Sequence, residues 1–185
     1  NLYPDSKLAI GPTIEDGFYY DVESSEVISS DDLTRIEDEM RRIIKTKSSI
    51  TKKLVSKSEA LKIFKSKKEP YKEIIINESD QTDDFQLYYQ DDEKFVDLCR
   101  GPHLPNLSFV GAFKLIKVSG AYWKGDSNNS MLTRIYGTAF KNDKDLQNYL
   151  DNLEEALKRD HRKLGKEMDL FHFQDEAPGM VFWHP

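Results

Sequence analysis

Two long runs rich in β-branched and aromatic residues, "FKLIKVSGAYW" and "MLTRIYGTAF", flank the polar loop "KGDSNNS". The Gly, Asp and Asn residues of this loop favour turns, so the stretch predicts an antiparallel hairpin. Two shorter hairpins are predicted in the same way, from alternating apolar residues on both sides of turn residues. Their strands are expected at about 8–14 and 17–22, around Asp16-Gly17, and at 85–89 and 95–97, around a turn at 91–93.

Apolar residues at helical spacing predict three helices. Ser29 and Asp32 form a capping pair before the first helix, and Ser56 and Glu59 repeat that pattern before the second. The helices are expected at 30–47, from 56 to the lysine cluster before Pro70, and at 142–165, and "EIIIN" is predicted as a buried strand. This order predicts an α+β fold, in which an antiparallel sheet has helices on one face and a long connector helix follows.

A length of 185 residues suits one domain of ordinary size, with room for an appendage. The single cysteine excludes an internal disulfide, and no apolar run has the length needed to span a bilayer. We therefore expect a soluble, cytoplasmic protein without membrane contact. Neither end of the chain resembles a natural terminus, so we also expect it to be a piece of a longer polypeptide.

The charge is unevenly distributed along the chain. Residues 41–72 contain twelve Lys and Arg residues against only Glu59 and Glu69, although the whole chain has a net charge of −6. This segment can bind an anionic partner such as a nucleic-acid backbone. A solvated, lysine-rich surface explains the same composition without any partner.

The stretch "FVDLCRGPHLP", residues 95–105, gathers groups that can carry chemistry. In a strand, Asp97 and Cys99 lie on the same face. His103 follows on a loop that prolines stiffen, so it can fold back toward Cys99. A Cys-His nucleophilic pair, a metal site and a buried thiol beside an unrelated loop are all compatible with this pattern. The metal site has weak support because the other histidines show no matching spacing, and none is predicted.

Five motifs along the chain point to a known family. They are "IGPTIEDGFYYD", "VDLCRGPHLPN", "SGAYWKGDSNN", "RIYGTAF" and "RDHRKLGKEMDLFHFQDEAPGMVFWHP". Together they resemble the bacterial-type threonyl-tRNA synthetase family, and the resemblance covers nearly the whole chain. It implies that residues 1–141 are an editing domain truncated at its N-terminal side. It further implies that residues 142–165 are the connector helix and that residues 166–185 start the class II aminoacylation domain.

The resemblance implies hydrolysis of serine that has been attached wrongly to threonine tRNA. A missing methyl group gives a binding site only about 1–3 kcal/mol of discrimination, so a second site must correct the errors. The matching positions are the candidate catalytic residues Lys72, Asp97 and His103 and the candidate substrate-binding residues Tyr20 and Cys99. Lys72 would offset negative charge, and Tyr20 would contact the terminal adenosine. Asp97 would orient a water or hold the substrate ammonium group, and His103 would position or deprotonate that water.

The implied partner is the acceptor end of tRNA(Thr) carrying serine. No cofactor is expected for this chain, whereas the parent enzyme would use ATP with magnesium, and zinc in a catalytic core that lies outside it. The family also has a His-x-x-x-His pair on a helix upstream of this chain, so we expect weak or no hydrolysis by these residues alone. We expect a monomer here and a homodimer for the parent enzyme. The alternatives are a noncatalytic tRNA-binding module and a zinc-dependent, free-standing editing hydrolase.

Overall fold

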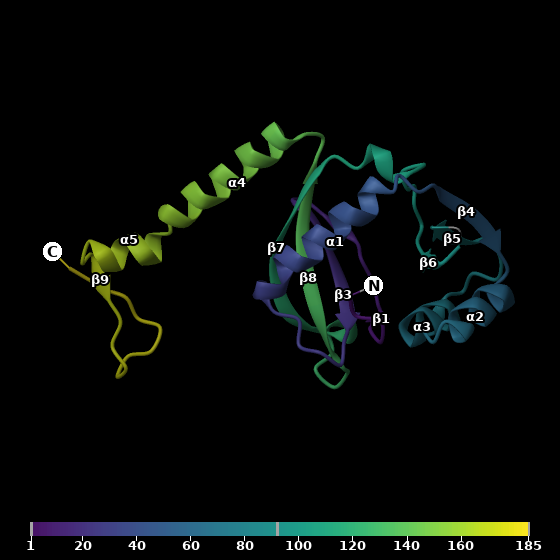
Figure 1. The fold of residues 1–185 in the computed structure, drawn as a ribbon. Helices are drawn as coiled ribbons and strands as arrows, with labels where there is room; N and C mark the ends of the chain where they lie inside the picture. The colour runs from purple at the N-terminus through teal and green to yellow at the C-terminus, as the bar shows by residue number, and fades with distance from the viewer. Residues whose placement is uncertain (1, 92, 185) are drawn as a thin grey trace. The chain divides into compact units, whose positions relative to one another are not determined.

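The computed structural model describes residues 2–91 and 93–184. The chain divides into two compact units, Asn1–Lys141 and Asn142–Pro185. The first unit contains two antiparallel sheets with their helices, and the second contains two helices and a short strand pair (Figure 1). The predicted α+β class is confirmed, with the strands distributed over separate sheets.

The larger sheet of the first unit has the strand order β1-β3-β8-β7, and β2 pairs with β3 beside this path. Its strands are β1 (Lys7–Leu8), β2 (Thr13–Ile14), β3 (Gly17–Glu23), β7 (Ala112–Tyr122) and β8 (Met131–Phe140). Helix α1 (Leu33–Lys45) lies across this sheet in Figure 1 and follows a short 3-10 turn, η1 (Ser30–Asp32). The Glu37 side chain ties α1 to β7, because its Oε1 accepts a hydrogen bond from the Leu115 N–H at 2.9 Å.

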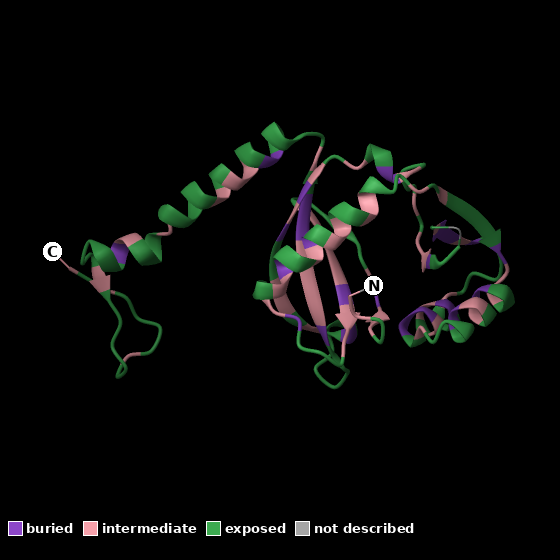
Figure 2. Cartoon of the chain, in the orientation of Figure 1, coloured by how far each residue is buried: buried purple, intermediate pink, exposed green. Residues whose placement is uncertain are grey.

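The smaller sheet has the order β4-β5-β6 and packs against two helices. Its elements are β4 (Ile50–Val55), β5 (Phe85–Gln90), β6 (Phe95–Leu98), α2 (Lys57–Ser66) and α3 (Pro70–Glu78). Alternate residues of β5 point into a core that also holds the fully buried side chains of Phe64 and Ile76. Figure 2 shows buried residues along the inner sides of α2 and α3, and exposed residues on their outer turns.

The predicted hairpins are present, with differences in detail. The first turn is made by Glu15 and Asp16, since Ile14 pairs with Gly17. The predicted strand at 8–14 is divided into β1 and β2, because Pro12 has no N–H to donate and the register shifts by one residue between the two pairings. The hairpin of β7 and β8 is confirmed, and a 3-10 turn, η3 (Trp123–Gly125), overlaps the start of its loop. In the β5–β6 hairpin, Asp92 of the predicted turn lies outside the described residues.

The prediction of a buried strand at "EIIIN" is wrong, because these residues belong to helix α3. A short apolar run does not distinguish a buried strand from a buried helix. Pro70 occupies the first turn of α3, where its fixed φ suits a helix and its missing N–H costs nothing. The consequence for the site is that Lys72 lies in the first turn of a helix.

The prediction of one helix over 142–165 is also wrong in its continuity. The second unit has α4 (Asp143–Lys158) and α5 (His161–Glu167), followed by β9 (Phe171–His172) and β10 (Phe182–Trp183). The side chain of Asp160 accepts a hydrogen bond from the Arg162 N–H at 2.8 Å and so starts a new helix. Gly165 is buried inside α5, where an added Cβ would lie 2.0 Å from the Phe171 ring.

Candidate functional site

Three of the predicted site residues meet in one polar network within the first unit. Tyr20 comes from β3, Lys72 from α3 and Asp97 from β6. The Tyr20 hydroxyl donates to Asp97 Oδ2 at 2.7 Å, and Lys72 Nζ lies 2.5 Å from Asp97 Oδ1. Lys72 Nζ also donates to the Tyr20 hydroxyl oxygen at 3.3 Å. The network therefore joins the larger sheet to the smaller sheet and its helix.

Lys72 is buried, with 3% of its surface exposed. A buried ammonium group is costly unless it is paired and hydrogen-bonded, and both conditions are met here by Asp97 and Tyr20. Removing water from such a pair offsets most of the Coulomb attraction, so the pair contributes little to stability by itself. What it provides is a positive charge at a fixed place.

The Tyr20 hydroxyl is held as a donor. Burial is the main cause that raises the pKa of Tyr20, and the negative charge of Asp97 and the hydrogen bond to it raise the pKa further. The hydroxyl therefore stays protonated at neutral pH and cannot act as a base. The ring packs against the backbone at Gly11, where an added Cβ would lie 2.2 Å from Tyr20 Cδ2. The absence of a side chain at Gly11 thus leaves room for the Tyr20 ring.

Asp97 uses both carboxylate oxygens within the protein. Oδ1 accepts from the Leu98 N–H at 2.7 Å and faces Lys72, while Oδ2 accepts from Tyr20. A carboxylate has about four acceptor positions, so these contacts leave about one for a ligand or a water molecule. The side chain is 19% exposed, which gives that position access from outside.

Cys99 lies next to this network, directly after β6. Its N–H donates to the Gln86 carbonyl at 3.2 Å, which continues the strand pairing, and its Sγ accepts from the Gly101 N–H at 3.4 Å. Cys99 is also one of the groups that raise the pKa of Tyr20, after burial, Asp97 and Glu69. The half-buried thiol therefore helps to shape the loop that follows.

His103 lies on the exposed loop after Cys99 and reaches the network through another side chain. Its imidazole ring packs against the Tyr88 ring with 4.2 Å between ring centroids and 51° between ring planes. Tyr88 pairs with Asp97 in the β5–β6 ladder, so the side chains of Tyr88 and Asp97 share one face of the sheet. Tyr88 thus pairs with Asp97 and contacts the imidazole of His103.

Sequence reasoning missed two neighbours of the site, Glu69 and Tyr88. The Glu69 carboxylate accepts from the Leu8 N–H at 2.9 Å, and its pKa is raised mainly by burial, despite the opposing effect of this hydrogen bond and of Lys72. Glu69 lies three residues before Lys72, which brings the two side chains to the same part of the fold only if the segment is helical. Because a strand is predicted directly after Lys72, Glu69 was not recognised. Tyr88 could have been found by pairing the predicted strands in register with Asp97.

The comparisons with known proteins address the family directly. Residues 86–136 match the family described as threonyl and alanyl tRNA synthetase second additional domain. The chain is 55% identical over 184 residues to a threonine--tRNA ligase of Prochlorococcus marinus (strain MIT 9211), covering 100% of this chain and 28% of that protein. It is 56% identical over 184 residues to one of Legionella pneumophila (strain Corby), covering 100% of this chain and 29% of that protein. The chain belongs to the threonyl-tRNA synthetase family.

The matched synthetase domain contains only some of the candidate site residues. Asp97, Cys99 and His103 lie inside the matched synthetase domain at 86–136, whereas Tyr20 and Lys72 lie before it. The similarity to threonine--tRNA ligases extends along the whole chain and includes them. The chain spans about 28% of the length of these relatives, so the activity of the complete enzyme concerns residues beyond it as well.

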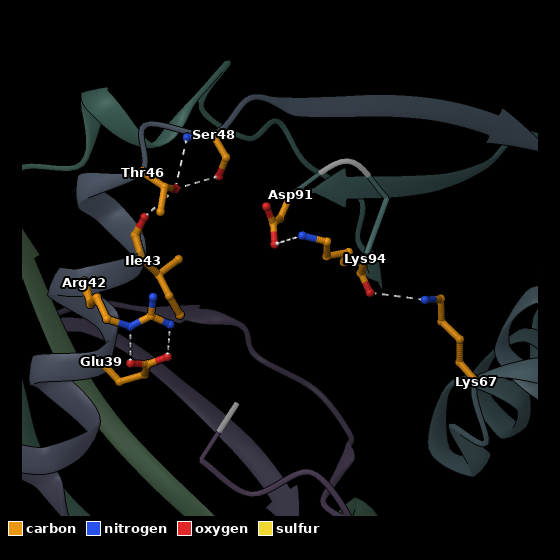
Figure 3. Close-up of polar contacts among 8 residues, drawn as sticks. All are labelled: Glu39, Arg42, Ile43, Thr46, Ser48, Lys67, Asp91 and Lys94. Carbon is orange, nitrogen blue, oxygen red and sulfur yellow. Dashed lines mark hydrogen bonds and ion pairs between the residues drawn. The ribbon is translucent and has the colours of Figure 1, made fainter.

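This synthetase segment also contains an apolar cleft of about 810 Å³ beside α1. Its lining includes Ile36, Met40 and Ile43 of α1 and Phe95 of β6. Figure 3 shows polar contacts on its rim, where Arg42 holds Glu39 through two bonds of 2.6 Å and Lys94 Nζ lies 3.4 Å from Asp91.

Two further findings concern all the described residues, 2–91 and 93–184. Within these ranges no cluster of three or more His, Cys, Asp and Glu side chains is arranged to hold a metal ion. Within the same ranges, no helix combines the length and apolar character that crossing a membrane requires.

Proposed function

We propose that this chain is the editing region of a threonine--tRNA ligase and that it serves to hydrolyse the ester of Ser-tRNA(Thr). The observation that carries the proposal is the Tyr20–Asp97–Lys72 network, because it keeps a cation and a carboxylate oriented at the junction of two sheets. A buried ion pair contributes little to stability, so its presence on β6, the strand that leads to the His103 loop, favours a role in chemistry.

The proposed reaction uses water as the nucleophile. His103 takes a proton from the water as its oxygen attacks the ester carbon, and the resulting oxyanion is stabilised by the positive charge of Lys72. The intermediate collapses when the bond to the 3′ oxygen of the adenosine breaks, and that oxygen receives the proton from His103. The free acceptor position of Asp97 binds the substrate ammonium group, and Tyr20 keeps the carboxylate oriented. The products are serine and free tRNA.

The selectivity follows from size. The synthetic site cannot exclude serine, because serine is smaller than threonine, and it gains only about 1–3 kcal/mol from the extra methyl group. An editing site can reject threonine by steric exclusion. We assign to Cys99, half-buried directly after β6, the border of the pocket for the amino acid side chain.

The test is deacylation of Ser-tRNA(Thr) by the full-length protein. His103→Ala should lower the rate constant by at least about 100-fold, which is the usual contribution of a general base. His161→Ala, which changes an exposed histidine of α5, is the matched control and should have no effect. Deacylation at the wild-type rate by His103→Ala would refute the assigned role.

The activity of the 185 residues by themselves is a separate question. We expect feeble or no hydrolysis, because the family's His-x-x-x-His pair precedes this segment. Rates for the 185-residue chain and for the same chain extended upstream decide this point. Equal rates would show that the two upstream histidines are dispensable.

A second candidate function is tRNA binding without catalysis. It is favoured by exposed lysines on β4 and α2, which include Lys52, Lys62 and Lys65. Phosphate contacts make binding steeply dependent on salt, and each lost contact lowers that dependence. Steeply salt-dependent tRNA binding with no deacylation, even by the full-length protein, would favour this candidate.

The remaining parts of the proposal concern cofactor, assembly and location. The water mechanism needs no cofactor, and a zinc-dependent hydrolase would instead contain metal by elemental analysis and lose activity with a chelator. We propose that the chain is a cytoplasmic monomer. A stable dimer of the chain in sedimentation experiments would contradict this.

A further inference from the structure

Tyr88 connects two groups that the proposed reaction needs together. It is 9% exposed, and it pairs with Asp97 across the β5–β6 ladder. Its ring lies against the imidazole of His103, which is on an exposed loop. An exposed loop by itself does not hold an imidazole at a fixed distance from a carboxylate as firmly as contact with a buried ring on a paired strand does.

The loop is shaped to fit against this ring. Gly101 has a φ of +65°, and a Cβ at that position would lie 1.8 Å from the Tyr88 hydroxyl oxygen and 2.7 Å from Cζ. Only glycine satisfies both the backbone conformation and the close approach. The Gly101 N–H donates to Cys99 Sγ at 3.4 Å, and the Tyr88 hydroxyl donates to Gln86 Oε1 at 3.4 Å. The segment from Cys99 to His103 therefore bends around the Tyr88 side chain.

We infer that Tyr88 is a positioning residue that sets the place of the His103 imidazole relative to Asp97. The inference rests on the proposed function and deepens it, because it assigns to Tyr88 an effect that acts through His103. A displacement of about 1 Å in a reacting group can cost about 100-fold in rate. Loss of the ring should therefore reduce hydrolysis although Tyr88 touches no substrate.

The competing explanation is that Tyr88 has only a packing role in the folded protein. A double-mutant cycle separates the two, because an effect that acts through His103 disappears when His103 is absent. In the full-length protein, Tyr88→Leu should slow single-turnover deacylation of Ser-tRNA(Thr) by about 10- to 100-fold. In the His103→Ala background the same change should cost less than about twofold. An equal loss in both backgrounds would overturn the inference.

Two further variants distinguish a loss of positioning from a folding defect. Tyr88→Phe keeps the ring and should retain most of the wild-type rate. A large loss of rate in Tyr88→Phe would show that the hydroxyl, and not the ring, is needed. Gly101→Ala pushes a Cβ into the Tyr88 hydroxyl and should show the same dependence on His103 as Tyr88→Leu. A Gly101→Ala variant with wild-type rate would show that the close approach is not needed.

An independent readout needs no activity. In the NMR spectrum of the 185-residue chain, Tyr88→Leu should remove a ring-current shift from the His103 imidazole protons and leave those of His161 unchanged. Unchanged His103 signals would overturn the contact itself. If the wild-type protein does not hydrolyse the ester, the proposed function fails and the catalytic part of the inference fails with it. The NMR result then decides whether Tyr88 positions His103 at all.

Discussion

The hydroxyl of Tyr20 can be tested as a donor to a charged acceptor. It donates to Asp97 at 2.7 Å and accepts from Lys72 at 3.3 Å, so Tyr20→Phe leaves both charged groups with one partner fewer. Hydrogen bonds to charged groups contribute about 1.5–3 kcal/mol, and we expect the free energy of unfolding to fall by that amount. Urea denaturation measures it. Tyr19→Phe, at the neighbouring position of β3, is the control, and an equal effect of both changes would contradict the prediction.

Glu37 predicts a dependence of stability on pH. Burial acts to raise its pKa, but hydrogen bonds from the Leu115 N–H and Lys114, with help from Arg41, lower the pKa below its ordinary value of 4.5. A lowered folded-state pKa stabilises the fold above the unfolded pKa, and this contribution is lost as pH falls through the folded value. Glu37→Gln should therefore destabilise the protein at pH 7 and lose less stability on acidification below 4.5. Urea denaturation at several pH values measures both effects.

The control for this pH series lies on the same helix. Asp38→Asn removes an exposed carboxylate one position further along α1 and should change neither the stability at neutral pH nor the acid response of Glu37. An acid limb that is the same in wild type and Glu37→Gln would show that this carboxylate does not set the response.

At the scale of elements, a capping box starts the 3-10 turn η1, which leads directly into α1. The Ser29 side chain accepts from the Asp31 N–H at 3.2 Å, and Asp32 accepts from the Ser29 N–H at 2.9 Å. Replacing such a cap by alanine costs about 1 kcal/mol, so Ser29→Ala should lower the free energy of unfolding by that amount. Ser30→Ala changes an exposed neighbour and serves as the control. Equal stability of the two variants would exclude the cap as the cause.

The elements that could be predicted from the sequence are those whose signals are local. The cap at Ser29 lies next to the 3-10 turn that leads into α1, the cap at Ser56 lies next to α2, and both are confirmed. Helix α3 was not predictable from its three isoleucines, because strand and helix bury such a run equally well. The break at Asp160 was missed because the helical spacing of apolar residues continues across it. The break is marked only by the side chain of Asp160, which caps the start of α5.

The site shows the same division. Strand alternation was enough to predict that Asp97 and Cys99 lie on the same side of the sheet. The contact between Lys72 and Asp97 was not predictable by spacing, since it depends on how α3 packs against the sheet. The position of His103 depends on the register of β5 against β6 and on a glycine close to Tyr88, and neither is visible in the residues around the histidine.

At the scale of the molecule, the candidate site lies where the two sheets of the first unit are joined. The polar network links β3 to α3 and β6. An apolar cluster makes a second link, because Tyr71 of α3 packs with Trp123 and Leu132 of the larger sheet's hairpin. Tyr71 and Trp123 meet edge to face with 4.9 Å between ring centroids. The two sheets should therefore unfold together.

Phe64→Ala tests this coupling. Phe64 is fully buried in the core of the smaller sheet, and its truncation should cost about 3–5 kcal/mol. If the sheets unfold as one unit, the slowest-exchanging amides of β3 and β8 should lose protection by more than about 100-fold together with those of β5. Hydrogen exchange measured by mass spectrometry resolves these strands. Leu157→Ala, at an exposed position of α4, is the control and should leave all of them unchanged. A loss confined to β4, β5 and β6 would show instead that the smaller sheet opens independently, and the site geometry would then depend on a contact that breaks without global unfolding.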